Sequence, residues 1–293
     1  MTGPKDDVAC IWPAGAILGE GPLWDEHEGA LYWVDIKAPA VHRYYPAGGE
    51  KKTWPMPEMI GCIAKRRRGG FVAAFQSGFA FVDLGRGKLE RIGNPEPELS
   101  GNRFNDGKCD AAGSFWAGSM DDALRRPTGW LYRLDPDLSW EKVDGGYVCT
   151  NGPAFSPDGR TMYHADSHGR TIYVYDLSGA GQVANKRVFA RFGQDEGVPD
   201  GMTTDTDGCL WVCHWGGWRI TRFRPDGKVD RTVAMPVSRV TSCAFGGPDF
   251  ATLYVTSAAT GLDAAALAKE PLAGGLFSFR PGVRGVPEPD FAG

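Results

Sequence analysis

One pattern of apolar and polar positions recurs six times along the chain. Each copy has a glycine, a short apolar stretch, a turn containing Asp or Gly, and then an aromatic-rich stretch. In one copy, Gly152-Pro-Ala-Phe-Ser-Pro-Asp-Gly159 leads to Arg160-Thr-Met-Tyr-His-Ala-Asp166. The copies begin near positions 21, 62, 107, 152, 201 and 242, so they are 41 to 49 residues apart. A strand-built repeat of about 40 to 50 residues is typical of one β-propeller blade with about four strands.

The second half of each copy also reads as β-structure. Thr171-Ile-Tyr-Val-Tyr-Asp176 and Gly129-Trp-Leu-Tyr-Arg-Leu134 are aromatic and β-branched stretches of the kind that favours strands. Asp-Gly pairs at 158–159, 207–208 and 226–227 are hairpin signals. We therefore predict an all-β fold, a six-bladed β-propeller, as one domain over residues 1–293.

Both ends of the chain and one internal segment depart from this pattern. Asp7-Val-Ala-Cys-Ile-Trp12 precedes the first copy, and it could complete the last blade and so close the ring without a long free edge. Asp263-Ala-Ala-Ala-Leu-Ala-Lys269 is the only helix-like stretch. We expect the tail from Pro281 to Gly293 to be ordered only in part.

Composition and charge narrow the classes of protein. The net charge of −4 argues against a nucleic-acid partner, and no stretch approaches the ~20 apolar residues of a membrane helix. The N-terminus lacks the layout of a signal peptide. The seven cysteines are odd in number, widely spaced and without a CxxC pair, which favours reduced thiols. We expect a cytoplasmic protein that binds neither nucleic acid nor a membrane; nothing in the sequence indicates an oligomeric state.

Oxygen-bearing side chains precede the first glycine of four copies. These register residues are Glu20, Asp106, Asn151 and Asp200. Equivalent positions in a ring of blades lie on one circle around the axis, so the four side chains could converge in the central channel. Such a cluster needs a cation or a proton to offset its charge, and oxygen donors suit calcium, magnesium or manganese, with zinc or iron less selective. Asp and Asn before glycine are also common turn residues, whereas Glu20 is not a turn specialist.

Two tryptophans near the expected channel mouth and two histidines are further candidates for the site. Trp215 and Trp218 flank a Gly-Gly pair, where they could stack on a sugar ring or belong to the core. His164 and His168 could act as ligands or bases, or they could make local hydrogen bonds in a strand. The sequence has no Gly-X-Ser-X-Gly elbow and no glycine-rich phosphate loop, which argues against a serine hydrolase and a nucleotide site.

Five short motifs spread along the chain point to a known family. They are Gly19-Glu-Gly-Pro22, Asn102-Arg-Phe-Asn-Asp-Gly-Lys108, Thr150-Asn-Gly152, Pro199-Asp-Gly-Met202 and Ser242-Cys-Ala-Phe-Gly-Gly247. Together they resemble the motifs of the SMP-30/gluconolactonase family of regucalcin-like sugar lactonases, nearly end to end. The resemblance implies a six-bladed propeller that holds one divalent metal in its channel and takes a small sugar lactone as its partner molecule.

The resemblance also implies roles for three of the four register residues. The family's metal ligands correspond to Glu20, Asn151 and Asp200, and Asp200 is also its acid/base residue. The expected reaction is hydrolysis of a sugar lactone to the aldonic acid. The metal (calcium, zinc, manganese, magnesium or iron) would polarise the lactone carbonyl, and Asp200 would take a proton from water and return it to the leaving ring oxygen.

Substrate contacts follow from the same resemblance. Arg103 and Asn105 correspond to the family's substrate-contacting pair, and Asp122 corresponds to a further acidic contact, in a loop with Asp121 that is shorter and differently spaced. Two other functions stay open: a broader esterase or phosphotriesterase on the same site, and a calcium-binding or protein-binding propeller without turnover. The polar character of Arg103, Asn105 and Asp122 favours a polyol over the apolar substrates of the first alternative.

Overall fold

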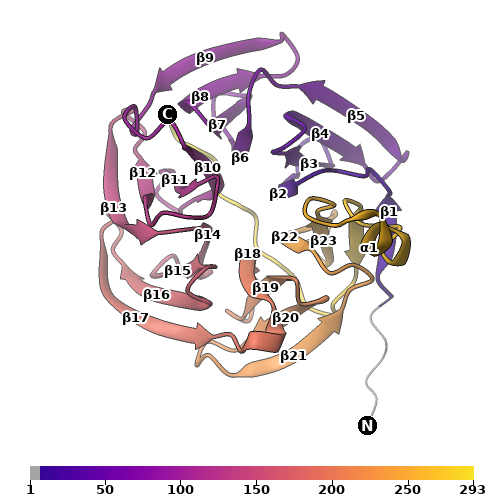
Figure 1. The fold of residues 1–293 in the computed structure, drawn as a ribbon. Coiled ribbons are helices and arrows are strands. Elements are labelled where there is room, and N and C mark those ends of the chain that lie inside the picture. The colour runs from indigo at the N-terminus through magenta and orange to yellow at the C-terminus, as the bar shows by residue number, and fades with distance from the viewer. Residues whose placement is uncertain (1–6) are drawn as a thin grey trace.

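The sheets stand side by side around one central axis, like the blades of a propeller (Figure 1). The computed structural model describes residues 7–293. Within these residues there are six sheets, and each has four antiparallel strands. The predicted all-β, six-bladed β-propeller is therefore confirmed. The assignment of residues 1–293 to one domain stays a prediction, and its first six residues lie outside the described residues.

In the first five blades the strands follow chain order from the axis outward. The first blade has β2 (Gly19–Asp25), β3 (Ala30–Asp35), β4 (Ala40–Tyr45) and β5 (Glu50–Pro55). The second has β6 (Ile60–Lys65), β7 (Phe71–Phe75), β8 (Gly78–Asp83) and β9 (Lys88–Gly93). The third has β10 (Asn102–Cys109), β11 (Phe115–Asp121), β12 (Gly129–Leu134) and β13 (Trp140–Tyr147). The fourth has β14 (Thr150–Phe155), β15 (Thr161–Asp166), β16 (Thr171–Leu177) and β17 (Val183–Arg191). The fifth has β18 (Val198–Thr204), β19 (Leu210–Trp215), β20 (Arg219–Phe223) and β21 (Val229–Ala234).

The last blade joins the two ends of the chain. Its inner strands are β22 (Val240–Gly246), β23 (Thr252–Ser257) and β24 (Leu276–Phe279), and its outermost strand is β1 (Ala9–Trp12). β1 runs antiparallel to β24, with Ala9 opposite Ser278. The expectation that the N-terminal segment completes the last blade is confirmed.

Burial changes from the axis outward within each blade. β3 is buried at all six positions, whereas five of the six residues of β5 are exposed. The charged side chains of outer strands, such as Lys51 and Lys52, discourage edge-to-edge pairing with another chain. The largest fully buried side chains include Trp33, Trp116 and Trp211. Each of them lies on the second strand of its blade, so the aromatic-rich half of the repeat supplies the core.

One short α-helix, α1 (Ala264–Lys269), and one 3-10 turn, η1 (Gln194–Glu196), lie among the described strands. The side chain of Asp263 accepts a hydrogen bond of 2.8 Å from the N–H of Ala266 and so caps the first turn of α1. The helix expected at this place is therefore confirmed. No helix within residues 7–293 is long and apolar enough to cross a membrane.

The tail from residue 281 to residue 293 lies across the ring (Figure 1). Phe291 is fully buried and forms a parallel bridge with Arg66, and Glu288 makes an ion pair with Lys108. The expectation that this tail is ordered only in part is wrong. The residues that the tail contacts lie far from it in the sequence, so no local sequence pattern predicts these contacts.

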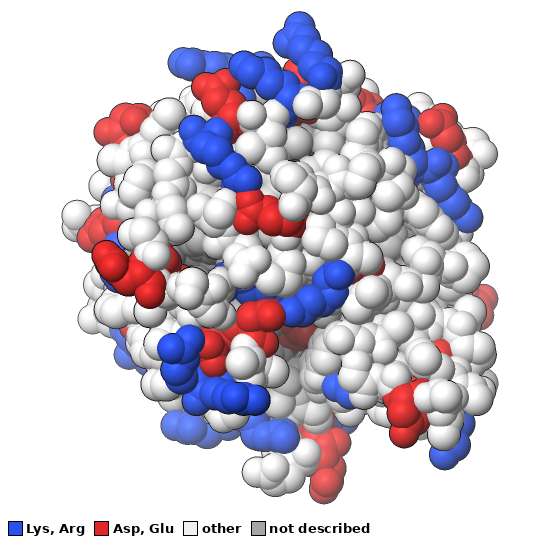
Figure 2. Space-filling view, turned by 45° about the horizontal axis from the view of Figure 1, so that its top comes forward, with Lys and Arg blue, Asp and Glu red and all other residues white. Residues whose placement is uncertain are grey.

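The charged side chains on the surface and the cysteines are distributed as the composition of the chain predicts. On the face shown in Figure 2, Lys and Arg side chains lie among Asp and Glu side chains rather than in a patch of one sign. All seven cysteines are free thiols, and five of them are buried. The burial of most of these thiols agrees with the interpretation of the cysteines as reduced.

Candidate active site

A break in strand register occurs near the axis in every blade. It falls between the first and second strands at residues 20–23, 60–62, 104–107, 151–154, 199–202 and 240–243. A β-bulge bends its strand and turns a side chain out of the regular alternation. The bulges at Glu20, Asn151 and Asp200 place these three side chains in the lining of one cavity.

The glycine that follows each register residue is required by its surroundings. Gly21 and Gly152 have φ angles of 49° and 74°, in the left-handed region that glycine tolerates best. At Gly201, an added Cβ atom would lie 2.2 Å from the Oγ atom of Ser242. The Asx/Glu–Gly pairs of the repeat are therefore a consequence of the bulges.

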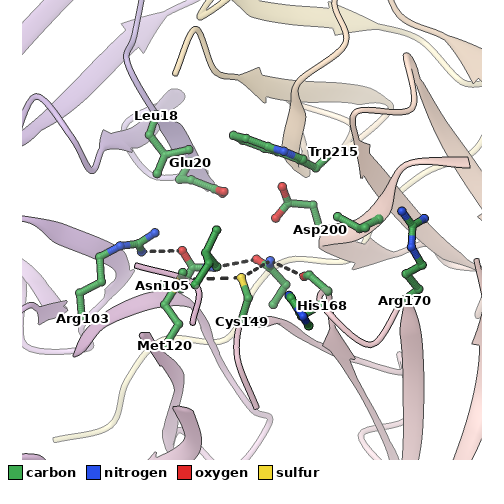
Figure 3. A pocket seen from close by; sticks show the side chains of 14 residues that line it. Leu18, Glu20, Arg103, Asn105, Met120, Cys149, His168, Arg170, Asp200 and Trp215 are labelled. Carbon is green, nitrogen blue, oxygen red and sulfur yellow. Dashed lines mark hydrogen bonds between the residues drawn. The ribbon is translucent and has the colours of Figure 1, made fainter. Parts of the chain in front are cut away.

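The cavity has a volume of about 390 Å³ and opens where the innermost strands begin. Figure 3 shows the carboxylates of Glu20 and Asp200 directed toward each other in it. Glu20, Asn151 and Asp200 are each only 4% exposed. The apolar part of the lining consists of Leu18, Met120, Leu124, Val198 and Trp215.

The two carboxylates in the cavity carry an unfavourable charge when ionised. Burial raises the pKa of Glu20 well above its ordinary value, and the negative charges of Asp200 and Asp106 raise it further. Burial likewise raises the pKa of Asp200 well above its ordinary value, with the charge of Asp106 as the second cause. The positive charge of Arg103 acts in the opposite direction on both groups but does not offset the increase. A bound cation would relieve this charge.

Asp106 is the register residue that does not line the cavity. Its Oδ1 atom accepts a hydrogen bond of 2.8 Å from the N–H of Gly107, and its Oδ2 atom accepts one of 3.1 Å from the N–H of Gly152. Burial raises the pKa of Asp106 to about 6, although the charge of Lys108 and these two N–H groups lower it. Asp106 therefore connects the third blade to the fourth, and each of its oxygen atoms accepts a hydrogen bond from a backbone N–H group.

The donor set at the cavity is two carboxylates and one amide. Among the described residues, no cluster of three or more His, Cys, Asp and Glu side chains is placed to hold a metal ion. The third oxygen donor beside Glu20 and Asp200 is instead the amide of Asn151. Three oxygen donors of this kind are typical of sites for hard divalent cations.

A chain of hydrogen bonds links three blades along one wall of the cavity (Figure 3). Arg103 Nη1 donates to Asn105 Oδ1 at 2.7 Å, and Asn105 Nδ2 donates to Asn151 Oδ1 at 3.0 Å. Asn151 Nδ2 donates to Ser167 Oγ at 2.8 Å, and Ser167 donates to the carbonyl of Pro199 at 2.6 Å. The chain fixes which atom of each amide faces the cavity.

Asp122 lies beside Arg103 and outside the cavity lining. Its carboxylate accepts hydrogen bonds of 2.6 Å from Lys37 Nζ and 2.7 Å from Arg103 Nε. Burial raises the pKa of Asp122, but these two cations outweigh it and lower the pKa below its ordinary value. Asp121 is buried and accepts a hydrogen bond of 3.0 Å from Arg126 instead. The predicted contact of Asp122 with substrate stays a prediction.

Some of the tryptophan and histidine candidates line the cavity, and the others lie outside it. Trp215 and His168 line the cavity, whereas Trp218 is 44% exposed and lies outside its lining. His164 is fully buried, and burial lowers its pKa to about 4. Neither ring nitrogen of His164 has a hydrogen-bond partner in the described part of the chain. His164 therefore makes no local hydrogen bond with the described residues, and it lies outside the cavity lining.

Sequence reasoning missed several residues of the cavity. Leu18, Cys149 and Val198 each lie two positions before a register residue that lines it. Side chains two positions apart in a strand face the same side, so this spacing could have identified them. Ser167 and Arg170 lie on the turn between β15 and β16, and no local motif marks them.

Comparison with known proteins shows related sequences and structures along nearly the whole chain. Residues 18–259 match the family model described as SMP-30/Gluconolactonase/LRE-like region. The 6-deoxy-6-sulfogluconolactonase of Pseudomonas putida is 38% identical over 99% of this chain and 100% of that protein. The L-arabinolactonase of Azospirillum brasilense is 41% identical over 94% and 92% of the two chains. The crystal structure of a calcium-binding protein, regucalcin, from Agrobacterium tumefaciens superposes with a TM-score of 0.94, at 28% identity and 98% coverage of each chain.

Proposed function

Because the chain belongs to the SMP-30/gluconolactonase family, we propose that it hydrolyses a sugar lactone to the corresponding aldonic acid in the cavity described above. One observation carries the proposal: two buried carboxylates, an amide oxygen and an arginine converge in one cavity. The names of the two bacterial relatives indicate lactones of different sugars, which supports the substrate class.

The residues present fit a divalent cation. Glu20 and Asp200 supply negative charge that is buried, and Asn151 supplies a neutral oxygen donor. Calcium, magnesium and manganese prefer such oxygen donors, and zinc or iron can use them less selectively. A cation held by these three side chains supplies a Lewis acid for the carbonyl oxygen of a lactone. The calcium-binding description of the Agrobacterium relative supports this assignment.

Asp200 is the proposed general acid/base. Its Oδ1 atom accepts a hydrogen bond of 3.0 Å from the N–H of Gly201, whereas Oδ2 accepts none within the described residues and can take part in proton transfer. The carboxylate accepts a proton from the attacking water and returns it to the ring oxygen as the ester bond breaks. With a cation beside it, Asp200 would stay ionised, because an opposite charge lowers the pKa of a carboxyl group.

Arg103 and Asn105 are the proposed substrate contacts, and their hydrogen bonds assign them different tasks. Both N–H groups of the Asn105 amide are used, by the carbonyl of Thr150 at 2.8 Å and by Asn151. Asn105 therefore contributes the second lone pair of Oδ1, which accepts a hydrogen bond from a sugar hydroxyl. Arg103 Nε and Nη1 bond to protein groups, and this leaves the N–H groups of Nη2 for a hydroxyl or carbonyl oxygen of the substrate.

One observation favours a second candidate function. The apolar part of the cavity lining also suits the alkyl or aryl group of a simple ester, so a broader esterase on the same site is the alternative. A binding propeller without turnover is the third outcome that an experiment must separate.

The deciding experiment is pH-stat titration, because lactone hydrolysis releases an acid. Metal-stripped protein is tested alone and with calcium, magnesium, manganese, zinc or iron(II) added singly, against aldonolactones, aryl esters and an aryl phosphotriester. We expect turnover of aldonolactones that depends on the added metal and is lost in Asp200→Asn. Faster turnover of aryl esters would support the esterase, and bound metal without any turnover would refute the proposed function.

A further inference from the structure

One cation in the cavity lining has no acidic partner. Arg103 and Arg170 both line the cavity, but the carboxylate of Asp122 compensates Arg103. No salt bridge joins Arg170 to any described carboxylate, and its Nη1 atom bonds only to the carbonyls of Gly193 at 2.9 Å and Gly197 at 2.8 Å. The Nε and Nη2 donors of Arg170 have no hydrogen bond within the described residues.

Arg170 lies on the opposite side of the cavity from Arg103 (Figure 3). No hydrogen bond or salt bridge joins Arg170 to Glu20 or Asp200 among the described residues, and the carbonyls of Gly193 and Gly197 hold its guanidinium instead. Arg170 therefore does not serve to balance the carboxylates of Glu20 and Asp200. Its positive charge stands apart from the site of the ester bond, where a distal group of the substrate would reach.

The backbone conformation at Arg170 also indicates that the turn alone does not explain an arginine at this position. Its φ angle is 52°, in the left-handed region, where a side chain other than Gly, Asn or Asp costs about 1 kcal/mol. A glycine would hold this turn with less strain. The hydrogen bonds from Nη1 to Gly193 and Gly197 hold the guanidinium against the neighbouring loop, with its remaining donors available to a ligand.

We propose that Arg170 forms a subsite for an anionic group on the substrate, so that the preferred lactone carries a carboxylate, sulfonate or phosphate at the end remote from its carbonyl. The planar guanidinium, held by Nη1, offers Nε and Nη2 as a fork for two oxygen atoms of one anion. His168, two positions earlier on the same turn, also lines the cavity and adds a ring N–H donor. This inference rests on the proposed function, and it extends that function to one class of substrate.

The test compares lactones that differ only in one substituent. D-glucono-1,5-lactone is compared with derivatives that carry carboxylate, sulfonate or phosphate at C6, for the wild type, Arg170→Gln and Arg170→Lys. Arg191→Gln is the matched control, because Arg191 is an exposed arginine of the same blade that lies outside the cavity lining. We expect the wild type to prefer at least one anionic lactone, and the comparison of the three anions identifies which.

In Arg170→Gln, kcat/KM for the anionic lactone should fall by roughly tenfold or more, because a hydrogen bond to a charged group is lost. In the same variant, kcat/KM for the neutral lactone should fall by less than about threefold. Arg170→Lys should recover part of the preference, and Arg191→Gln should keep all of it. Equal losses for neutral and anionic lactones in Arg170→Gln would show that Arg170 only supports the 193–197 loop, and they would overturn the inference.

Binding separates this inference from the proposed function. Calorimetry with 6-phosphogluconate and gluconate measures the preference for an anion without any turnover. Tighter binding of 6-phosphogluconate than of gluconate that is lost in Arg170→Gln would support the subsite. It would do so even if the protein hydrolysed no lactone, because the lack of hydrolysis would refute only the proposed lactonase function. Hydrolysis of the neutral lactone with no preference for any anion, in kinetics or in binding, would overturn the subsite and leave the function intact.

Discussion

Removal of the Asp106 charge should make the metal-free protein progressively more stable, relative to the wild type, as the pH rises. Burial raises the pKa of Asp106 from 3.8 to about 6. A group with a raised pKa in the folded state contributes stability that is fully present below its unfolded pKa and is lost as the pH rises through the folded pKa. A difference of about 2 pH units corresponds to about 3 kcal/mol. The wild type therefore loses about 3 kcal/mol through this group between about pH 4 and pH 8, and Asp106→Asn does not.

The measurement is the difference in free energy of unfolding between Asp106→Asn and the wild type across this pH range. Urea titrations in the presence of a chelator, followed by tryptophan fluorescence, supply both values. The substitution also loses one of the hydrogen bonds from Gly107 or Gly152, which costs about 1 kcal/mol. The two N–H groups favour the ionised carboxylate, and the pKa of about 6 already includes their effect, so the difference curve should still rise with pH.

A control with the opposite sign is available at Asp226. The N–H of Lys228 donates to this exposed carboxylate and lowers its pKa, so its contribution to stability is present above the unfolded pKa and is lost as the pH falls. The difference curve for Asp226→Asn should therefore fall with rising pH only below about pH 4, and it should stay level between about pH 5 and pH 8. A difference curve for Asp106→Asn that is flat or falls with pH would refute the reasoning about buried charge at the axis.

Four further outcomes are expected. Glu20→Gln should bind less divalent metal without unfolding, because one charged donor is lost; unchanged metal content by mass spectrometry of the folded variant would contradict this. Asp200→Asn should retain some metal and lose about 100-fold or more in kcat, the low end of general acid–base catalysis, and near-normal turnover with metal bound would remove Asp200 from the proton transfer. Arg103→Ala should lower kcat/KM with the metal still in place, since a guanidinium cannot ligate a cation; loss of metal from the folded variant would argue against a substrate role. Phe291→Ala should lower the free energy of unfolding by about 3 to 5 kcal/mol, because the ring is fully buried, and a change below about 1 kcal/mol would show that the tail does not contribute to the core.

The repeat made the fold predictable, because each blade satisfies the same local requirements. A glycine that permits the bulge, an aromatic second strand and an Asp-Gly turn occur in fixed order, so six copies imply six sheets. The same register predicted that Glu20, Asn151 and Asp200 lie together, as they do in the lining of the cavity. The register could not show that Asp106 lies outside the cavity lining. That position depends on the N–H of Gly152 in the next blade, which donates a hydrogen bond to Asp106 Oδ2.

Contacts between distant segments account for what the sequence did not predict. Arg170 enters the cavity from a turn whose direction depends on the 193–197 loop. The partners of Asp122 include Lys37, a residue of the first blade that lies 85 positions earlier. The burial of Phe291 likewise depends on the second and third blades, which lie about 200 positions before it. Such pairings have no periodic signature, so they require the three-dimensional arrangement.

The strand that closes the ring also sets the order in which the molecule can be completed during synthesis. The strands of each of the first five blades follow one another along the chain, so each of these blades can form soon after it leaves the ribosome. β1 is made first but pairs with β24, and Ala9 and Ser278 are 269 positions apart. Until β24 is made, the apolar Ala-Cys-Ile-Trp segment of β1 has no partner, and it is then open to pairing with another chain. The newly made chain therefore stays vulnerable to aggregation until β24 has been made.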